Sequence, residues 1–215
     1  MFSTPFWVVV TLAAAVGLVL WWRRDRKRKA KAKERAETVA AHRAEDPLSD
    51  DAQVAASGDP RKIKLGDVIE YLVRSFVVRG TAEFHEGRYS WKEHFVDEGD
   101  GGGAKKWLTV EDADEGLEVC LWTIIDGSGL SPRTAVVTYD GIEFIRDEWG
   151  TATYAADGQT GLEHTGRVEY FDFKALDGAL LSFERFDGSG EWEVAIGELI
   201  PNGELTVYPG GTPAA

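Results

Sequence analysis

Turn dipeptides that pair an acidic residue or asparagine with glycine recur along the chain after Arg61. They include Glu86-Gly87, Asp126-Gly127, Asp140-Gly141, Asp177-Gly178, Asp187-Gly188 and Asn202-Gly203. Such dipeptides favour tight hairpins because glycine adopts a positive φ at little cost. The segments between them alternate apolar and polar residues, and no amphipathic helical pattern of useful length follows Pro60. The sequence therefore predicts an all-β domain over residues 61–210, followed by a disordered tail at 211–215.

The all-β region also resembles itself. The matched blocks are Gly80-Thr81-Ala82 with Gly150-Thr151-Ala152, and Leu108-Thr109-Val110-Glu111 with Leu181-Ser182-Phe183-Glu184. Two tandem antiparallel repeats, at about 65–126 and 134–200, would together close a barrel or pair as a sandwich, and either arrangement hides edge strands. The alternative is that antiparallel sheets resemble one another at this level in general. The matched Gly-Thr-Ala blocks favour a true duplication.

The first 22 residues carry no ionisable side chain and have the length of a membrane span. About 20 helical residues cross a hydrocarbon core, and Trp7, Trp21 and Trp22 suit the two interfacial aromatic belts. A cleaved signal peptide would need positive charge before the apolar run, whereas here the basic residues follow it. We therefore expect residues 1–22 to form an uncleaved transmembrane helix.

A dense basic block follows this apolar run. Residues 23–35 hold nine Lys or Arg, which by the positive-inside rule predicts a single-pass protein with its N-terminus outside and its C-terminal domain in the cytoplasm. Residues expected at the membrane surface, near anionic headgroups, are Arg23, Arg24, Arg26, Lys27, Arg28 and Lys29. Strong helix formers predict a basic helical stalk over 23–45, and residues 46–60 have the composition of a flexible acidic linker.

The body of the chain is acidic. The formal net charge is −13 even with the basic block included, and a nucleic-acid-binding domain is therefore not expected, because neutralising phosphates needs a basic face. The single cysteine, Cys120, excludes an internal disulfide framework and a cysteine-based zinc site. Its apolar surroundings in sequence predict a buried, unreactive thiol.

No set of residues in the sequence converges on one chemistry. Trp91, His94 and Glu184 are the best candidates to line a pocket between the repeats or inside a barrel. Glu93 and His94 fall on opposite faces of a strand, so they cannot act together as acid and base. Histidines do not recur at metal-ligand spacing, and Gly-rich residues 97–103 match neither a calcium loop nor a phosphate loop. We predict no catalytic residue, no cofactor site and no metal site.

Several segments resemble the bacterial domain-of-unknown-function 4178 family. The segments are Lys64-Leu65-Gly66-Asp67-Val68-Ile69-Glu70-Tyr71, Val78-Arg79-Gly80-Thr81, Tyr89-Ser90-Trp91-Lys92-Glu93-His94, Leu181-Ser182-Phe183-Glu184-Arg185 and Leu205-Thr206-Val207-Tyr208-Pro209-Gly210. The resemblance implies no reaction, cofactor or catalytic residue. It implies a context, since such proteins tend to be encoded near small membrane proteins, spermidine-synthase-like enzymes and a membrane-stress protein of the phage-shock type.

These features favour a membrane-anchored, non-enzymatic binding or scaffold module that faces the cytoplasm. Its acidic domain would bind a basic protein or a polyamine, in an envelope-stress or polyamine-linked system. The alternative is a small-ligand-binding or enzymatic β-barrel domain with a pocket between the repeats. A third hypothesis is a structural subunit of a membrane complex, whose anchor packs through Ala13, Ala14 and Gly17. The bilayer would be contacted through residues 1–22.

Overall fold

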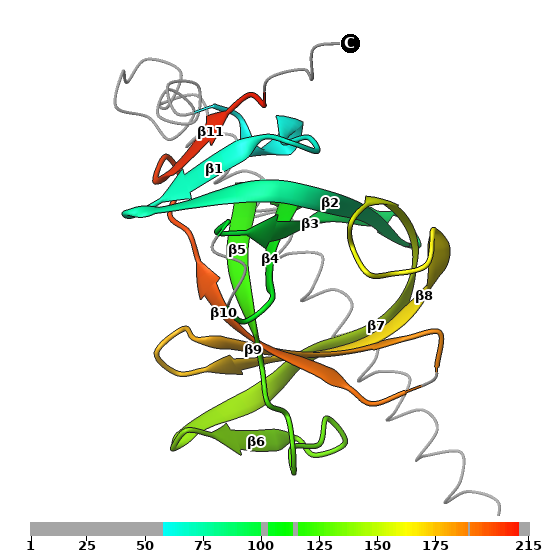
Figure 1. Ribbon diagram of the computed structural model, residues 1–215. Coiled ribbons are helices and arrows are strands. Elements are labelled where there is room, and N and C mark those ends of the chain that lie inside the picture. Colours follow the sequence, from blue (N-terminus) through cyan, green and yellow to red (C-terminus); the bar gives the residue numbers. More distant parts are fainter. Residues whose placement is uncertain (1–57, 100–102, 114–115, 189, 211–215) are drawn as a thin grey trace, which may run out of the picture. The chain divides into compact units, whose positions relative to one another are not determined.

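Antiparallel strands make up nearly all of the described part of the chain (Figure 1). The computed structural model describes residues 58–99, 103–113, 116–188 and 190–210. The elements are the 3-10 turn η1 (Pro60–Lys62) and the strands β1 (Val68–Tyr71), β2 (Arg74–Glu86), β3 (Tyr89–Asp97), β4 (Lys106–Ala113), β5 (Gly116–Ile125), β6 (Val136–Tyr139), β7 (Ile142–Gly158), β8 (Thr165–Ala175), β9 (Leu180–Phe186), β10 (Glu193–Leu199) and β11 (Leu205–Tyr208).

Eight of these strands form a closed ring in the order β2-β3-β4-β5-β10-β9-β8-β7. The second half of β2 pairs with the end of β7, from Gly80 opposite Gly158 to His85 opposite Thr153, and this pairing closes the barrel. The first halves of β2 and β7 pair instead with β1 and β6, and β11 adds to β1. In Figure 1, β1 and β11 lie at the top of the view and β6 at the bottom.

The two halves of the described chain follow the same order of pairings. β1 pairs with β2 as β6 pairs with β7, and the halves meet at the β2–β7 and β5–β10 ladders. β2 and β7 each change register once, between Val78 and Gly80 and between Arg146 and Glu148. The topology therefore repeats. A duplication with the boundaries expected above stays a prediction.

The fold class predicted from the sequence needs correction. The domain is one closed eight-stranded barrel with three added strands, rather than a sandwich, and η1 is its only helical element among the described residues. No helix in the described part of the chain is long and apolar enough to span a bilayer, so the structure does not support the transmembrane helix and basic stalk of that fold class. Those segments, 1–22 and 23–45, lie outside the described residues, as do most of the 46–60 linker and the 211–215 tail.

Bulges explain why a barrel forms. β2 and β7 are the longest strands, with 13 and 17 residues. Each carries its bulge near the point where it leaves one neighbour and joins another. A bulge bends and twists a strand, which lets these two strands each belong to an outer layer and to the ring. The alternation of single strands does not reveal this long-range pairing.

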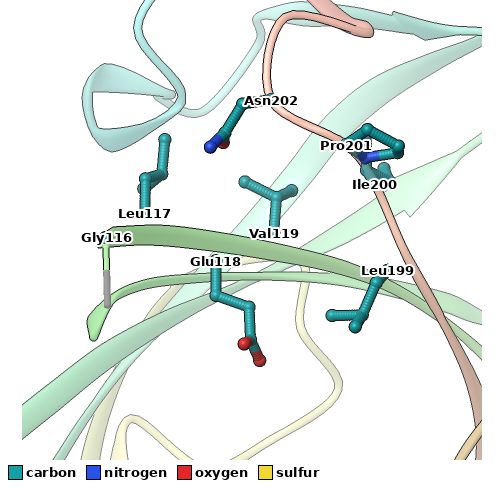
Figure 2. Close-up of a pocket in the computed structure, with 8 residues that line it drawn as sticks. All are labelled: Gly116, Leu117, Glu118, Val119, Leu199, Ile200, Pro201 and Asn202. Carbon is teal, nitrogen blue, oxygen red and sulfur yellow. The ribbon is translucent and has the colours of Figure 1, made fainter. Parts of the chain in front are cut away.

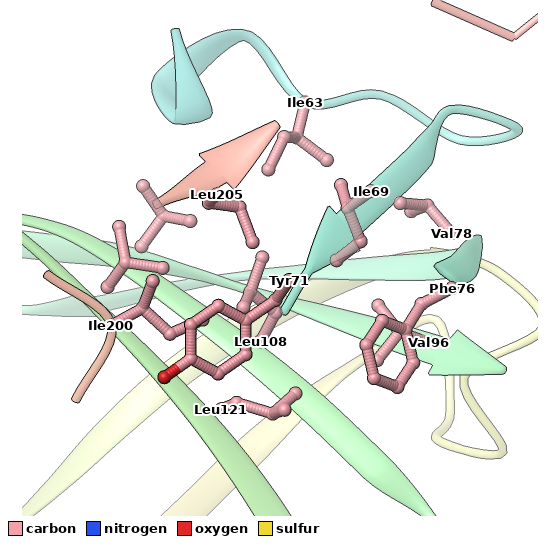
Figure 3. Packing of buried hydrophobic residues seen from close by; sticks show 12 residues of the cluster. Ile63, Ile69, Tyr71, Phe76, Val78, Val96, Leu108, Leu121, Ile200 and Leu205 are labelled. Atoms are coloured by element: carbon pink, nitrogen blue, oxygen red, sulfur yellow. The ribbon is translucent and has the colours of Figure 1, made fainter. Parts of the chain in front are cut away.

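Two apolar cores lie on the outside of the ring. Figure 3 shows the first, in which side chains from β1, from β11 and from the residue after η1 cover the outer face of β2–β5. Its labelled members are Ile63, Ile69, Tyr71, Phe76, Val78, Val96, Leu108, Leu121, Ile200 and Leu205. The second core lies between β6 and the outer face of β7–β10, and includes Val137, Phe144, Phe173, Leu181 and Phe183. Each half of the chain thus has its own apolar core.

A third apolar cluster fills the side of the barrel interior where β2 meets β7. Phe84 stacks on Trp91 at 5.2 Å between ring centroids and lies 5.7 Å from Tyr154. The Phe186 ring packs edge to face against Tyr154, with 5.6 Å between the ring centroids. Small residues such as Ala82 belong to the same cluster. The remainder of the inner wall is not apolar, and it forms the candidate site.

Candidate functional site

Carboxylates line the inner wall of the barrel. Each of the eight ring strands contributes one at an inward position, and they are Glu86, Glu93, Glu111, Glu118, Glu148, Asp172, Glu184 and Glu193. Contacts between strands that are not neighbours in the ring support this assignment. The Tyr170 hydroxyl on β8 donates a hydrogen bond to Glu86 on β2. The charges of Asp172 on β8 and Glu193 on β10 contribute to raising the pKa of Glu93 on β3.

Among the described residues, one ion pair involves a carboxylate of this wall. The Lys105 ammonium, just before β4, lies 3.8 Å from Glu193 Oε2, and the Lys105 side chain is 64% exposed. None of the other seven inward carboxylates forms an ion pair with a described residue. The interior is therefore strongly electronegative, with partial compensation from Lys105 at its rim.

Three carboxyl groups, those of Glu93, Asp172 and Glu184, lie close enough to interact with one another. Glu93 is only 8% exposed, and its Oε1 accepts a hydrogen bond from Trp91 Nε1 at 2.8 Å, while its Oε2 has no hydrogen-bond partner in the described part of the chain. Asp172 lies directly opposite Ser182 in the β8–β9 pair. Glu184 has neither a hydrogen bond nor an ion pair with any described residue, and it lies near Glu93, Asp172 and Glu193.

Burial changes the acidity of these groups. It raises the pKa of Glu93 to about 7 and that of Asp172 to about 7, with repulsion from neighbouring carboxylates adding to both. Burial, then the charges of Glu93 and Asp172, raise the pKa of Glu184 well above its usual value. Desolvation and like charges both disfavour the ionised form. The centre of the barrel thus holds carboxyl groups that titrate near neutrality.

Glutamates face each other directly at two places on this wall. Glu111 on β4 is opposite Glu118 on β5, and Glu184 on β9 is opposite Glu193 on β10. These two hairpins occupy corresponding places in the two halves. Like charges directly across an antiparallel pair are destabilising. Burial, and then the charges of Glu118 and Glu148, raise the pKa of Glu111.

Aromatic side chains border the carboxylates. The indole of Trp91 lies edge to face with Tyr170 at 5.9 Å, and the Trp122 Nε1 donates to Thr109 Oγ1 at 2.9 Å. Trp122 also packs against Gly197, where a Cβ would fall 2.6 Å from its Cζ3. Trp91, Trp122 and Glu184 are only partly buried, which means that solvent reaches the part of the interior beside them.

Of the residues expected to line a pocket, the structure brings Trp91 and Glu184 together in the barrel interior and places His94 elsewhere. His94 points outward, 1% exposed, with its Nδ1 2.8 Å from Thr81 Oγ1. Its Nε2 has no hydrogen-bond partner among the described residues. Burial lowers the pKa of His94 to about 4, so it is a neutral core residue at physiological pH. The expected membrane-surface residues Arg23, Arg24, Arg26, Lys27, Arg28 and Lys29 lie outside the described residues.

Sequence reasoning missed most of the carboxylates. In β10, Glu193 alternates with the apolar residues Val194 and Ile196, a pattern that is typical of a strand with one solvent-facing side. Both faces of the strand are in fact covered, since the apolar residues pack in the outer core and Glu193 points inward. One usable signal was present, because the matched blocks of the two halves both end in glutamate, at Glu111 and Glu184.

Cys120 also lies on the inner wall. Its thiol is buried, and burial, followed by the charge of Glu118, raises its pKa far above the ordinary value. A thiol of this kind stays protonated and is a poor nucleophile. The expectation of a buried, unreactive cysteine agrees with this environment.

Two hollows lie on the outer surface of the domain. One, of about 310 Å³, lies between the start of β5 and the β10–β11 connection, where Figure 2 shows Leu117 and Val119 on one side of the strand and Glu118 on the other. The second, of about 530 Å³, lies beside the β6–β7 and β8–β9 turns. Both are open to solvent, and neither contains any of the three residues expected to line a pocket. We therefore place the candidate site in the interior.

The carboxylates are spread along the wall rather than gathered at one point. Within the described residues, no three or more His, Cys, Asp or Glu side chains are arranged to hold a metal ion. Close convergence of oxygen ligands is what calcium and magnesium sites require. The arrangement is suited instead to several separate positive charges.

Comparison with known proteins places this barrel in a family. Residues 64–202 match the family described as "Domain of unknown function (DUF4178)". The chain belongs to that DUF4178 family. Similar proteins include uncharacterized proteins of Mycobacterium bovis and Mycobacterium tuberculosis, each 37% identical over 169 residues, which cover 76% of this chain and 79% of the relative. No solved structure matches the chain. The DUF4178 match covers the whole ring of strands and the carboxylates inside it.

Proposed function

We propose that this DUF4178 domain is a non-enzymatic binding module that takes an organic cation, a protonated amine, into the barrel interior. The observation that carries the proposal is the inward carboxylate on each of the eight ring strands, of which only Glu193 forms an ion pair with a described residue, Lys105 at the rim. This joins two sequence-based hypotheses, an acidic module for polyamines and a pocket between the repeats. A basic protein partner, the cytoplasmic location and the envelope-stress context stay predictions.

A positive ligand is favoured because the carboxylates inside the barrel are electrostatically costly. Glu93 is buried with a single hydrogen bond, and Glu184 has no hydrogen bond or ion pair with a described residue. Buried carboxylates without a cation either ionise at a large cost or stay protonated. A ligand that brings positive charge removes this cost, and the gain appears as binding free energy.

An amine suits the wall better than a metal ion does. The faces and edges of Trp91, Trp122 and Tyr170 border the acidic groups, and aromatic faces attract organic cations. An alkylammonium also donates up to three hydrogen bonds to separate acceptors, which matches carboxylates that are dispersed. The methylene groups between ammonium groups would contact the aromatic rings.

A catalytic role is less well supported. Carboxyl groups with a pKa of about 7, such as Glu93 and Asp172, are suited to general acid–base catalysis. However, the thiol of Cys120 is held protonated by burial, and His94 lies outside the interior. Neither Cys120 nor His94 therefore acts together with these acids, and binding accounts for the raised pKa values without a reaction.

Calorimetric titration of the full-length protein with spermidine at pH 8 tests the proposal. We expect binding that weakens with salt, and the Glu184→Gln variant to bind at least about tenfold more weakly, which corresponds to about 1.4 kcal/mol. Glu83→Gln is the matched control, because Glu83 lies on β2 with its side chain 48% exposed on the outer face. Equal effects of the two substitutions would mean that the amine binds the general surface charge, and absence of heat with wild-type protein would reject the proposal.

A further inference from the structure

We infer that the outer face of β7, β8 and β9 is a docking surface for an acidic segment of another protein, bound in an extended conformation. This surface lies outside the barrel and does not depend on the amine proposed above. It is built on five aromatic and arginine side chains, which we call the arginine–tryptophan row: Arg146, Trp149, Phe171, Arg185 and Trp192.

Ring and cation contacts join the members of the row. The Arg146 guanidinium lies 5.4 Å from the centre of the Trp149 ring and 5.9 Å from that of Phe171. Phe171 lies edge to face with Trp192 at 5.5 Å between ring centroids. The Arg185 guanidinium lies 4.6 Å from the centre of the Trp192 ring. The row is therefore one continuous surface that runs from β7 to the residue before β10.

Trp149 is the most exposed member of the row. Phe171 and Trp192 are partly buried because they pack against the second core. Trp149, in contrast, is 64% exposed, although tryptophan is highly buried on average. Tryptophan and arginine are the residues that most often dominate the binding energy of protein interfaces. An apolar side chain of a partner would cover the exposed indole.

Positive charge is concentrated on this face of a strongly acidic half of the chain. Residues 134–200 contain fourteen Asp or Glu but only four Lys or Arg, which are Arg146, Arg167, Lys174 and Arg185. Two of the four belong to the row. Arg167 lies two residues before Glu169, which is opposite Arg185, so its side chain emerges on the same face. An acidic segment is attracted here and repelled by the surrounding surface, which fixes where it docks.

The arginines of this face have unused hydrogen-bond donors. Arg146 and Arg167 form neither an ion pair nor a side-chain hydrogen bond with a described residue. Arg185 pairs with Glu169, but its Nε has no hydrogen-bond partner in the described part of the chain. A guanidinium that stacks on an aromatic ring keeps its in-plane N–H groups available, and these match carboxylates in a bidentate geometry. Carboxylates of a partner would supply the acceptors.

The positions of Arg146 and Arg167 define the length of the docked segment. Arg146 is opposite Phe173 on β8, six residues from Arg167. At about 3.3 Å per residue, the Cα atoms of the two arginines are roughly 20 Å apart. Trp149 is opposite Phe171 and therefore lies between them. An extended segment with two carboxylates about six residues apart and an apolar residue between them fits this arrangement.

Selection of a random peptide library displayed on phage against the full-length protein tests the inference. We expect the enriched peptides to carry two acidic residues, about six positions apart, with an apolar residue between them. The most enriched peptide, synthesised with a fluorescein label, should bind Arg146→Gln, Arg167→Gln and Trp149→Ala about fivefold more weakly or worse. Arg133→Gln is the matched control, because it removes the same charge from an exposed position in the β5–β6 connection. Circular dichroism of each variant verifies its fold.

Several outcomes would overturn the inference. They are the absence of enriched peptides, enriched peptides without acidic residues, and a loss of affinity in Arg133→Gln equal to that in Arg146→Gln. Single-stranded RNA or phosphatidylglycerol vesicles that bind the wild type and not Arg146→Gln would show that the partner is not an acidic protein segment. Spermidine binding should be unchanged in these variants, so the surface and the amine site can fail independently.

Discussion

Trp91 Nε1 donates a hydrogen bond to Glu93 Oε1 at 2.8 Å, from the next inward position on the same strand. This bond favours the ionised carboxylate, whereas burial and the charges of Asp172 and Glu193 oppose it. The indole also stacks on Phe84. A single side chain thus connects the aromatic side of the barrel interior to its acidic side.

Replacing this indole tests the connection. Trp91→Phe removes the only hydrogen bond of Glu93 with a described residue and should raise the pKa of that carboxyl. We expect the free energy of unfolding to fall by about 1.5–3 kcal/mol at pH 8 and by less at pH 5, where Glu93 is protonated. Urea denaturation at both pH values measures this. Trp149→Phe, at an outward position that is 64% exposed, is the control, and an equal loss at both pH values would contradict the electrostatic explanation.

The raised carboxyl pKa values make the stability of the free protein depend on pH. The folded-state pKa of Glu93 and of Asp172 is about 7, against about 4 in an unfolded chain. The folded protein therefore binds more protons than the unfolded chain between these values, and its stability falls as pH rises through 7. We expect the contribution to be complete below about pH 4 and a loss of at most about 4 kcal/mol for each of the two carboxyls by pH 8, because one unit of pKa difference corresponds to about 1.4 kcal/mol.

Denaturation of wild type and Glu184→Gln across this range measures the effect. The variant removes one of the interacting buried carboxyls, so it should be more stable than wild type at pH 8 and similar at pH 5. A wild-type stability that rises steadily from pH 5 to pH 8 would show that these groups are ionised and stabilised in the free protein.

Amine binding should release protons near neutral pH. A cation in the barrel interior favours the ionised forms of Glu93 and Asp172, which are partly protonated in the free protein at pH 6.5. Affinity should therefore increase with pH between 6 and 8. Calorimetry in buffers of different ionisation enthalpy at pH 6.5 counts the protons released, and an enthalpy that does not depend on the buffer would count against deep binding.

Close packing at the β5–β10 ladder should make Gly197 irreplaceable. A Cβ there would lie 2.6 Å from Trp122 Cζ3 and 2.9 Å from Cys120 Sγ. Gly197→Ala should cost about 1–3 kcal/mol because the indole has to move in a packed wall. Gly103→Ala is the control, since its Cβ would meet nothing within 4 Å. Thermal denaturation compares them, and equal midpoints would mean that the wall is loosely packed.

Much of the fold could be predicted from local sequence patterns. Asp140-Gly141 and Asp187-Gly188 do form turns in which both residues have positive φ, as their composition indicates. The all-β class after Arg61 and the DUF4178 family are confirmed. These features depend on residues that are near one another in the chain, where propensity and periodicity act directly.

The candidate site was only partly predictable. Trp91 and Glu184 were named from the sequence, whereas Asp172 and Glu193 were not. His94 was named too, yet it lies under the outer core. A strand pattern shows that two residues share a face, but it does not show what covers that face. Here both faces are covered, one by an apolar layer and the other by the opposite wall.

The amino-acid sequence by itself determined the strands, their turns and the sides on which Glu93 and His94 fall, because a strand alternates its side chains with a period of two. Only the tertiary structure decided which side became the interior. That choice depends on β2 pairing with β7, which joins Gly80 to Gly158, and such long-range pairing arises from the packing of the whole domain. Ring closure turned carboxylates that resemble solvent-facing residues in the sequence into an electronegative interior.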